Sequence, residues 1–158
     1  MKKYDCLFIG NAIVDIVANA SFEFLKEQNI DVGSWRPTKL DEISQLQNKM
    51  KDTLVASGGS AANSAVGFSF LGGKSSFIGR VKDDEFGQLY IKDLQDANVD
   101  FVSSAVKEGD ETGRCLVYVT PDAQRSMRTY LGAASNLSPD EINDQSVEDS
   151  EFIYMEGY

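Results

Sequence analysis

The chain has 158 residues, with 25 Asp and Glu against 15 Lys and Arg, no histidine and a formal net charge of −10. A nucleic-acid-binding domain needs a clustered basic surface, and a chain without histidine has no Ser-His-Asp triad and no His-ligated zinc, so these classes are excluded. The two cysteines, Cys6 and Cys115, lie in separate apolar runs, which is typical of small buried side chains in a reducing compartment.

The N-terminal stretch has some features of a secretory signal, because two lysines precede an apolar segment that ends in small residues. Asp5, Asn11 and Asp15 interrupt that segment, so it does not fit a signal peptide. No stretch of the chain approaches the roughly 20 apolar residues of a membrane span. We therefore expect a cytoplasmic protein with no membrane partner.

Short apolar runs alternate with helical patterns from the N-terminus to Asn98. The runs predict strands at 6–9, 53–56 and 75–79. The helical patterns predict a short helix capped by Ser21 and longer helices at 39–50, 61–71 and 84–95. Strands that alternate with helices indicate βαβ units and a parallel sheet. The helix at 61–71 is rich in small residues, so we expect it to lie deep in the fold.

After Asn98 the pattern changes. Strands without helices between them are predicted at 101–104, 113–120 and 126–131. The turn residues 121–123 predict a hairpin between the last two, and such an excursion from an α/β body is often a lid or an oligomerisation surface. Ser138 and Pro139 predict the start of a capped helix, and 151–156 predicts a final strand with no crossover helix after it.

The first candidate for a functional site is the segment 10–15, which follows the first predicted strand. Open α/β sheets bind their ligands at the carboxyl ends of their strands. The carboxylate of Asp15 could accept hydrogen bonds from two adjacent hydroxyls of a sugar, and Asn11 could both donate and accept. Alternatively, Asp15 caps a local turn and Asn11 supplies a left-handed backbone position.

The second candidate is the segment that contains Gly58, Gly59, Ser60 and Asn63. Two glycines at a strand end let the backbone approach a ligand closely, and the helix behind them directs free amides toward it. We expect Asn63 to face the same crevice as Ser60. The alternative is a tight strand-to-helix connection, with Ser60 as the N-cap and Asn63 merely solvated.

Other motifs argue against a cofactor site in this chain. The segment 72–75 resembles the end of a phosphate-binding loop, but Phe68 stands where that loop needs glycine and a strand follows. No dinucleotide fingerprint follows the first strand, which disfavours a Rossmann-type dehydrogenase. The acids at 83–85 lie at a predicted helix start, where we expect them to complement the helix dipole rather than bind a metal. We therefore expect no metal ligand or cofactor-binding residue here.

Taken together, these motifs resemble the amino-terminal half of the ribokinase or PfkB family of carbohydrate and nucleoside kinases. The segments that carry the resemblance follow in order along nearly the whole chain: 10–15, 58–65, 79–87 and 112–113. Lys82 stands where the family usually has glycine. The spacing from Asn11 to Asp15, and Ser60 directly after the glycine pair, look more like the adenosine-kinase branch than ribokinase itself.

The resemblance implies a ribokinase-like α/β fold of three layers, a parallel sheet flanked by helices, with a small β lid formed mostly by strands within about 101–131. It also implies a substrate site. Asp15, Asn63 and the amide of Gly59, in the signature that begins at Gly58, would hold the hydroxyls of a ribose-like ring. Asn11 and Ser60 would lie near the remainder of the substrate.

The resemblance further implies that residues 1–158 are the amino-terminal part of one kinase domain. Family members are longer and carry their catalytic base in a Gly-Ala-Gly-Asp motif of the second half, so no catalytic residue is expected here. ATP and Mg²⁺ would be bound beyond Tyr158. The expected function is the substrate-binding half of an ATP-dependent kinase that phosphorylates a primary hydroxyl of an adenosine-like nucleoside or ribose-type sugar. The alternative is a non-catalytic ligand-binding half-domain, and a homodimer through the lid stays open.

Overall fold

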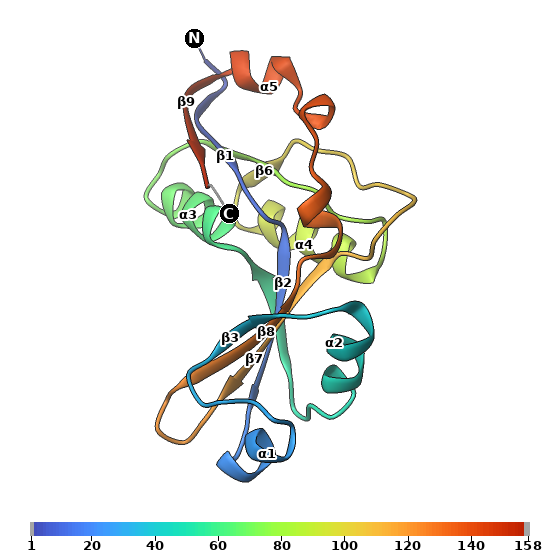
Figure 1. The fold of residues 1–158 in the computed structure, drawn as a ribbon. Helices are drawn as coiled ribbons and strands as arrows, with labels where there is room; N and C mark the ends of the chain where they lie inside the picture. Colours follow the sequence, from blue (N-terminus) through green and yellow to red (C-terminus); the bar gives the residue numbers. More distant parts are fainter. Residues whose placement is uncertain (1, 157–158) are drawn as a thin grey trace.

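The computed structural model describes residues 2–156, whose strands form two sheets joined by a narrow waist (Figure 1). The four-stranded sheet, called sheet A here, is wholly parallel and has the order β6-β5-β1-β9. Its strands are β1 (Tyr4–Ile9), β5 (Ser75–Ile78), β6 (Val99–Phe101) and β9 (Ser150–Met155). The five-stranded sheet, called sheet B, is mixed and has the order β3-β8-β7-β2-β4. Its strands are β2 (Ile13–Asn19), β3 (Trp35–Pro37), β4 (Leu54–Gly58), β7 (Gly113–Val119) and β8 (Arg125–Tyr130).

The inner strands of sheet A are covered on both faces, which gives the three-layer α/β arrangement expected from the sequence. The helices α3 (Ser60–Phe70) and α4 (Glu85–Asp96) pack on the face that carries Phe8. The other face carries Leu7 and Ile9 and is covered by side chains from the segment with η1 (Gly132–Asn136), η2 (Pro139–Glu141) and α5 (Asp144–Glu148). Because successive side chains of a strand point to opposite faces, a run buried on both faces is apolar throughout.

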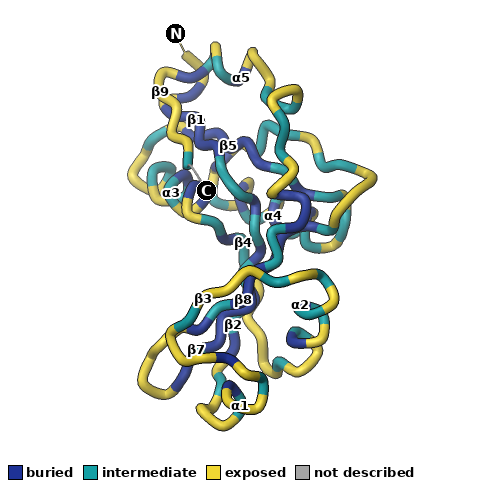
Figure 2. The backbone as a smooth tube through the Cα atoms, viewed as in Figure 1, coloured by how far each residue is buried: buried dark blue, intermediate teal, exposed yellow. Residues whose placement is uncertain are grey.

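Sheet B is covered on one face only. In β2, the buried residues Val14 and Ile16 alternate with half-buried Ile13 and Asp15. The buried face packs against α1 (Phe22–Glu27) and α2 (Leu40–Gln47), whose apolar side chains belong to the same core cluster. The other face carries Asp15 and is turned toward the carboxyl end of β1. In Figure 2, the dark blue of β7 marks the centre of this sheet, between β8 and β2.

Two of the predicted strands differ from the structure, one in the sheet that it joins and one in its position along the chain. The run predicted at 53–56 forms β4, but it pairs antiparallel with β2 in sheet B instead of joining the parallel sheet. The strand predicted at 101–104 is also misplaced: β6 lies earlier and extends sheet A beside β5. Asn98, in a left-handed conformation (φ 57°), turns the chain directly from α4 into β6. The lid strands predicted within 101–131 correspond to β7 and β8, which share sheet B with β2, β3 and β4.

Most predicted helices are present, with different ends. The Ser21 side chain caps α1 by accepting the Phe24 N–H (3.1 Å), as predicted. Helix α2 ends at Gln47, before the predicted end at residue 50. The segment after Ser138 forms a capping box but only a single 3₁₀ turn, η2, before α5 begins. Within residues 2–156, no helix has both the length and the apolar composition to cross a membrane.

Candidate functional site

A cavity of about 1020 Å³ lies at the carboxyl end of β1, between sheet A and the uncovered face of sheet B. The side chains from sheet B that line it are Ile13, Asp15, Trp35, Cys115, Met127 and Thr129. The opposite wall contains Ile9, Gly10, Asn11, Gly59, Ser60, Met155 and Glu156, and a third wall comes from residues 131–142. Ligands of open α/β proteins bind at this end of the strands, so the position itself marks a candidate site.

The floor of the cavity is a row of three residues from adjacent strands. Cys115 of β7 pairs with Asp15 of β2 on one side and with Thr129 of β8 on the other. Directly paired residues point to the same face of a sheet, so all three side chains point into the cavity. The Thr129 hydroxyl donates to the Cys115 sulfur (3.2 Å) and accepts the Nε1–H of Trp35 (3.1 Å). These bonds fix the position of Trp35 at the cavity wall.

Asp15 is the one acidic side chain on this floor. It is half-buried, and its carboxylate accepts no hydrogen bond from any residue in the described range 2–156. Burial raises the pKa of Asp15, and the positive charge of Arg125 partly offsets that increase. A half-buried carboxylate without a protein partner is free to accept hydrogen bonds from two hydroxyl groups of a ligand.

The glycine pair makes room for this carboxylate. A Cβ atom at Gly58 would overlap the carboxylate of Asp15, because β4 lies directly beside β2. Gly59 has a φ of 91°, which disfavours other residues, and a Cβ there would collide with the carbonyl oxygen of Asn11. Helix α3 then begins at Ser60 with no side-chain cap, so its first amides lie at the edge of the cavity.

The structure brings most of the predicted site residues together. Asn11, Asp15, Gly59 and Ser60 line the cavity, and Gly58 lies directly behind Asp15. The Ser60 hydroxyl donates to the carboxylate of Glu156 at the end of β9. Asn63 is exposed and does not line the cavity, so it does not share the crevice with Ser60 as expected. Asn63 lies one turn further along α3, beyond the first residues of the helix that border the cavity.

The structure does not show the local roles that were the alternative for the first segment. Asp15 lies inside β2, where it pairs with Ala56 and Cys115, so it neither ends the first strand nor caps a turn. Asn11 is not among the residues with positive φ, so the left-handed conformation considered for it is absent. The strand β2 was not predicted, because the polar Asp15 within 13–19 obscured a strand that alternates buried and half-buried positions.

Sequence reasoning missed the other lining residues of sheet B, which are Trp35, Cys115, Met127 and Thr129. The period of two in a strand could have shown that Met127 and Thr129 point to the same face of their strand. No local pattern could have shown that β7 lies beside β2, because that pairing joins segments far apart in the sequence. Cys115 was expected to be simply buried; it is buried, but its side chain also borders the cavity.

The described residues do not form a metal site. Within residues 2–156, no group of three or more carboxylate, thiol or imidazole side chains is placed to hold a metal ion. Asp84, from the acidic segment 83–85, caps α4 by accepting the Gly87 N–H (2.8 Å), in agreement with the helix-dipole interpretation. We assign none of the described residues to a Mg²⁺–nucleotide group.

Solved structures with a similar fold include kinases of nucleosides and sugars. An adenosine kinase from Sinorhizobium meliloti has a TM-score of 0.88 and 39% identity, over 97% of this chain and 47% of that protein. A probable sugar kinase from Rhizobium etli also has a TM-score of 0.88, with 35% identity over 98% of this chain and 47% of that protein. The chain thus spans about half the length of these similar structures.

Similar curated sequences are sugar kinases. Probable fructokinase-2 from Arabidopsis thaliana is 35% identical over 92 residues, 57% of this chain and 28% of that protein. A 5-dehydro-2-deoxygluconokinase from Bacillus velezensis is 26% identical over 143 residues, 86% of this chain and 43% of that protein. The family model described as "pfkB family carbohydrate kinase" matches residues 29–158. Because that match covers most of the chain and the fold agrees, the chain belongs to the PfkB family of carbohydrate kinases.

Proposed function

We propose that this chain is the substrate-binding half of an ATP-dependent kinase that phosphorylates a primary hydroxyl of a nucleoside or a ribose-type sugar. The observation that carries the proposal is the half-buried carboxylate of Asp15, which lines a large cavity and has no hydrogen-bonding partner among residues 2–156. In this proposal Asp15 accepts hydrogen bonds from two neighbouring hydroxyls of the substrate. A charged acceptor binds such a diol more strongly than a neutral one.

The other walls of the cavity suit a nucleoside. Gly59 and Ser60 offer backbone amides at the start of α3, and Asn11 can donate to or accept from a ring hydroxyl. Trp35 and Met127 give the cavity an apolar side on which the base would pack. The similarity to an adenosine kinase is in keeping with an adenosine-like substrate, and the similarity to sugar kinases is in keeping with a ribose-type sugar. We keep Gly58 and Asn63 in the proposed site. Gly58 makes space for the carboxylate of Asp15, and Asn63 would contact the substrate only after the site closes further around it.

We propose that the catalytic base, ATP and Mg²⁺ are contributed by a carboxyl-terminal half beyond Tyr158. The support is the length of the relatives and the surface of β9. Phe152 (66% exposed) and Ile153 (52% exposed) lie on opposite faces of this edge strand, and Met155 is 70% exposed. Parallel sheets are normally covered on both faces, so a strand with these residues is expected to lie inside a larger sheet.

Two further parts of the proposal concern location and assembly. We propose a cytoplasmic enzyme, since Cys6 and Cys115 are both free and buried. We also propose that a homodimer, if it forms, uses sheet B, whose edge strand β4 exposes Leu54 and Val55. With a net charge of −10 and no basic cluster in the sequence, we propose no nucleic-acid partner, and we propose no membrane partner.

A non-catalytic ligand-binding half-domain remains the second candidate. The same cavity supports it, because Asp15 and the walls around it need no catalytic group to bind a nucleoside. The two candidates differ only in phosphoryl transfer. ADP release, measured on the chain together with its carboxyl-terminal half, separates them: nucleoside binding without ADP release would favour the binding module.

The substrate proposal is tested by calorimetric titration of the 158-residue chain with adenosine, ribose and fructose. We expect adenosine to bind best, and Asp15→Asn to weaken binding by at least about tenfold, since a hydrogen bond to a charged group contributes about 1.5–3 kcal/mol. Asp41→Asn, an exposed position in the first turn of α2, is the matched control and should leave affinity unchanged. Equal affinity of the wild type and Asp15→Asn would refute the assignment.

A further inference from the structure

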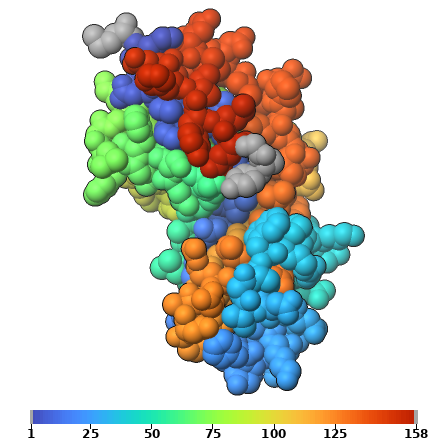
Figure 3. Space-filling model, turned by 60° about the vertical axis from the view of Figure 1, so that its left-hand side comes forward, coloured from blue at the N-terminus to red at the C-terminus, as the bar shows by residue number. Residues whose placement is uncertain are grey.

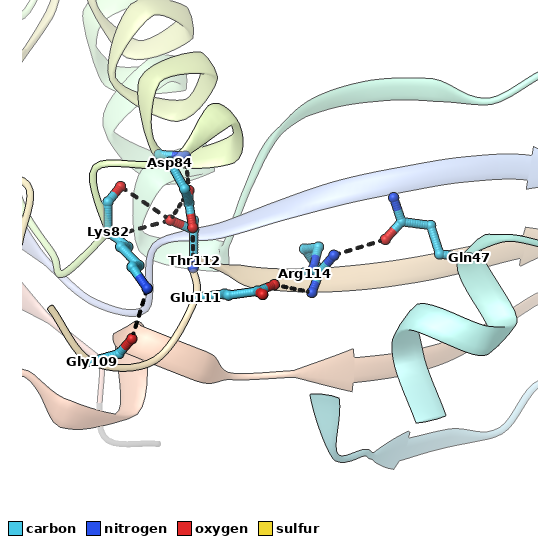
Figure 4. Close-up of polar contacts among 8 residues, drawn as sticks. Gln47, Lys82, Asp84, Gly109, Glu111, Thr112 and Arg114 are labelled. Atoms are coloured by element: carbon cyan, nitrogen blue, oxygen red, sulfur yellow. Dashed lines mark hydrogen bonds and ion pairs between the residues drawn. The ribbon is translucent and has the colours of Figure 1, made fainter. Parts of the chain in front are cut away.

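The point where β7 enters sheet B is held by a hydrogen-bonded pair, the half-buried Asp84 and the buried Thr112 (Figure 4). Thr112 is fully buried and lies directly before β7. Its backbone N–H donates to one carboxylate oxygen of Asp84 (3.0 Å), and its hydroxyl donates to the other (2.7 Å). Asp84 also accepts the Gly87 N–H at the start of α4 (2.8 Å). One carboxylate therefore joins a helix of the sheet A layer to a strand of sheet B.

The backbone around this pair is packed so closely that the pair has little freedom. The Lys82 N–H donates to the Thr112 hydroxyl (3.0 Å), so that hydroxyl both donates and accepts. A Cβ atom at Gly87 would lie 3.0 Å from the Thr112 hydroxyl oxygen and would collide with the Lys82 carbonyl. The Lys82 ammonium group donates to the Gly109 carbonyl (3.0 Å), which ties down the loop that leads to Thr112.

A second connection lies two residues further along the chain. Arg114 is on the face of β7 opposite Cys115, and its guanidinium group lies over the Phe86 ring of α4 at 5.2 Å. The same group donates to the Glu111 carboxylate (2.7 Å) and to the Gln47 side chain of α2 (3.0 Å). The first residues of β7 are thus attached both to α4 and to the helix that covers sheet B.

We propose that Asp84 and Thr112 are positioning residues, which hold β7 so that the row Asp15–Cys115–Thr129 faces the wall formed by Gly59 and Ser60. Cys115 follows Thr112 by three residues and pairs directly with Asp15, so a shift of Thr112 moves the cavity floor. The inference rests on the proposed function only in assuming that this floor binds the substrate. The hydrogen bonds themselves belong to the junction between the sheets, and their effect on β7 can be measured without substrate.

The two cysteines provide the test. Both are buried and free, with Cys6 on β1 of sheet A and Cys115 on β7 of sheet B. Burial raises the pKa of the Cys115 thiol to about 11 and also raises that of Cys6, so both thiols react slowly while the structure is closed. Labelling by a maleimide, followed by mass spectrometry of each cysteine peptide, therefore reports local opening of each sheet separately.

Thr112→Val keeps the size of the side chain and removes both hydrogen bonds of its hydroxyl. We expect it to raise the labelling rate of Cys115 by about tenfold or more, with Cys6 unchanged, because a hydrogen bond to a charged group is lost. Thr112→Ser keeps the hydroxyl and should restore the slow rate. Asp84→Asn keeps one acceptor oxygen and should give a smaller increase in the labelling rate of Cys115, again with Cys6 unchanged. This variant replaces Thr112→Val in the test if Thr112→Val does not fold.

Several outcomes would overturn the proposal. An unchanged Cys115 rate in Thr112→Val would show that the pair does not hold β7. Equal acceleration of Cys6 and Cys115 would show only a general loss of stability, and fast labelling in Thr112→Ser would exclude the hydroxyl as the cause. If Asp15→Asn bound the nucleoside as tightly as the wild type, the substrate proposal would fail but the cysteine labelling rates would be unaffected. The labelling test and the substrate proposal can therefore fail independently.

Discussion

Asp15 illustrates at the residue scale how a binding group is kept available at a cost in stability. Its carboxylate lies in a half-buried position beside Gly58, with no hydrogen-bond donor from residues 2–156. Burial penalises the charged form, and the charge of Arg125 offsets part of that penalty. A group placed for stability alone would be paired or exposed, so this setting fits a carboxylate reserved for a ligand.

Asp15→Asn should therefore stabilise the protein at neutral pH even though it weakens substrate binding. Because the folded-state pKa of Asp15 is raised, the folded protein binds this proton more tightly than the unfolded chain does, and stability falls as the pH rises through that pKa. The gain from Asn should shrink toward about pH 4, near the ordinary carboxyl pKa. Urea midpoints of both proteins at the two pH values measure it, and a less stable variant at neutral pH would contradict the argument.

At the scale of elements, α3 is built differently at its two ends. Its first turn follows Gly59, whose positive φ and contact with the Asn11 carbonyl bring the backbone to the edge of the cavity. Ala61 and Ala65 bury this end against sheet A, as the small residues of the sequence predict. The far end is not deep: Phe70 is 90% exposed, and the helix carries no charged residue along its length. The expectation that this helix lies deep in the fold therefore holds only for the end that begins at Ser60.

The glycines of this region should respond in opposite ways to the same substitution. Gly59→Ala should destabilise the fold by about 1–3 kcal/mol, the cost of a backbone conformation almost reserved for glycine, with a further loss from the Asn11 contact. Gly67→Ala, inside the helix with open space around it, should stabilise by about 0.5–1 kcal/mol. Chemical denaturation of the two variants measures both effects. Similar changes at the two positions would refute the special role of Gly59.

At the scale of the whole molecule, exposed apolar side chains gather on the edge strand β9. In Figure 2, β9 is largely yellow at the edge of sheet A, and Figure 3 shows its red side chains on the surface of the larger lobe. Phe152 and Tyr154 extend the face under α3, where Tyr154 packs beside Phe8 with ring centroids 5.4 Å apart. An apolar strand with a free hydrogen-bonding edge tends to recruit another strand.

The 158-residue chain should therefore self-associate as its concentration rises, and Ile153→Lys should reduce this association by placing a charge on the edge strand. Glu151→Lys changes the charge of the same strand without removing apolar surface and is the control. Sedimentation velocity over a range of concentrations measures the effect. A chain that stays monomeric at high concentration would show that the exposed apolar surface of β9 does not drive association.

The sequence by itself determined the local features of this protein. The apolar run at β1, the helix cap at Ser21 and the glycine pair before α3 depend on neighbouring residues, so their patterns predict them correctly. These features and the order of the motifs also indicated the family. Four of the six predicted site residues, Asn11, Asp15, Gly59 and Ser60, line the cavity.

Only the tertiary structure decided which strands share a sheet. The pairing of β2 with β7 places Cys115 beside Asp15, and the antiparallel pairing with β4 places Gly58 behind the same carboxylate. Strand pairing depends on backbone hydrogen bonds and packing between segments far apart in the chain, so a short run of residues does not encode it. The cavity floor and the Asp84–Thr112 pair arise from these distant contacts, whereas the helices and the inner strands arise from local pattern.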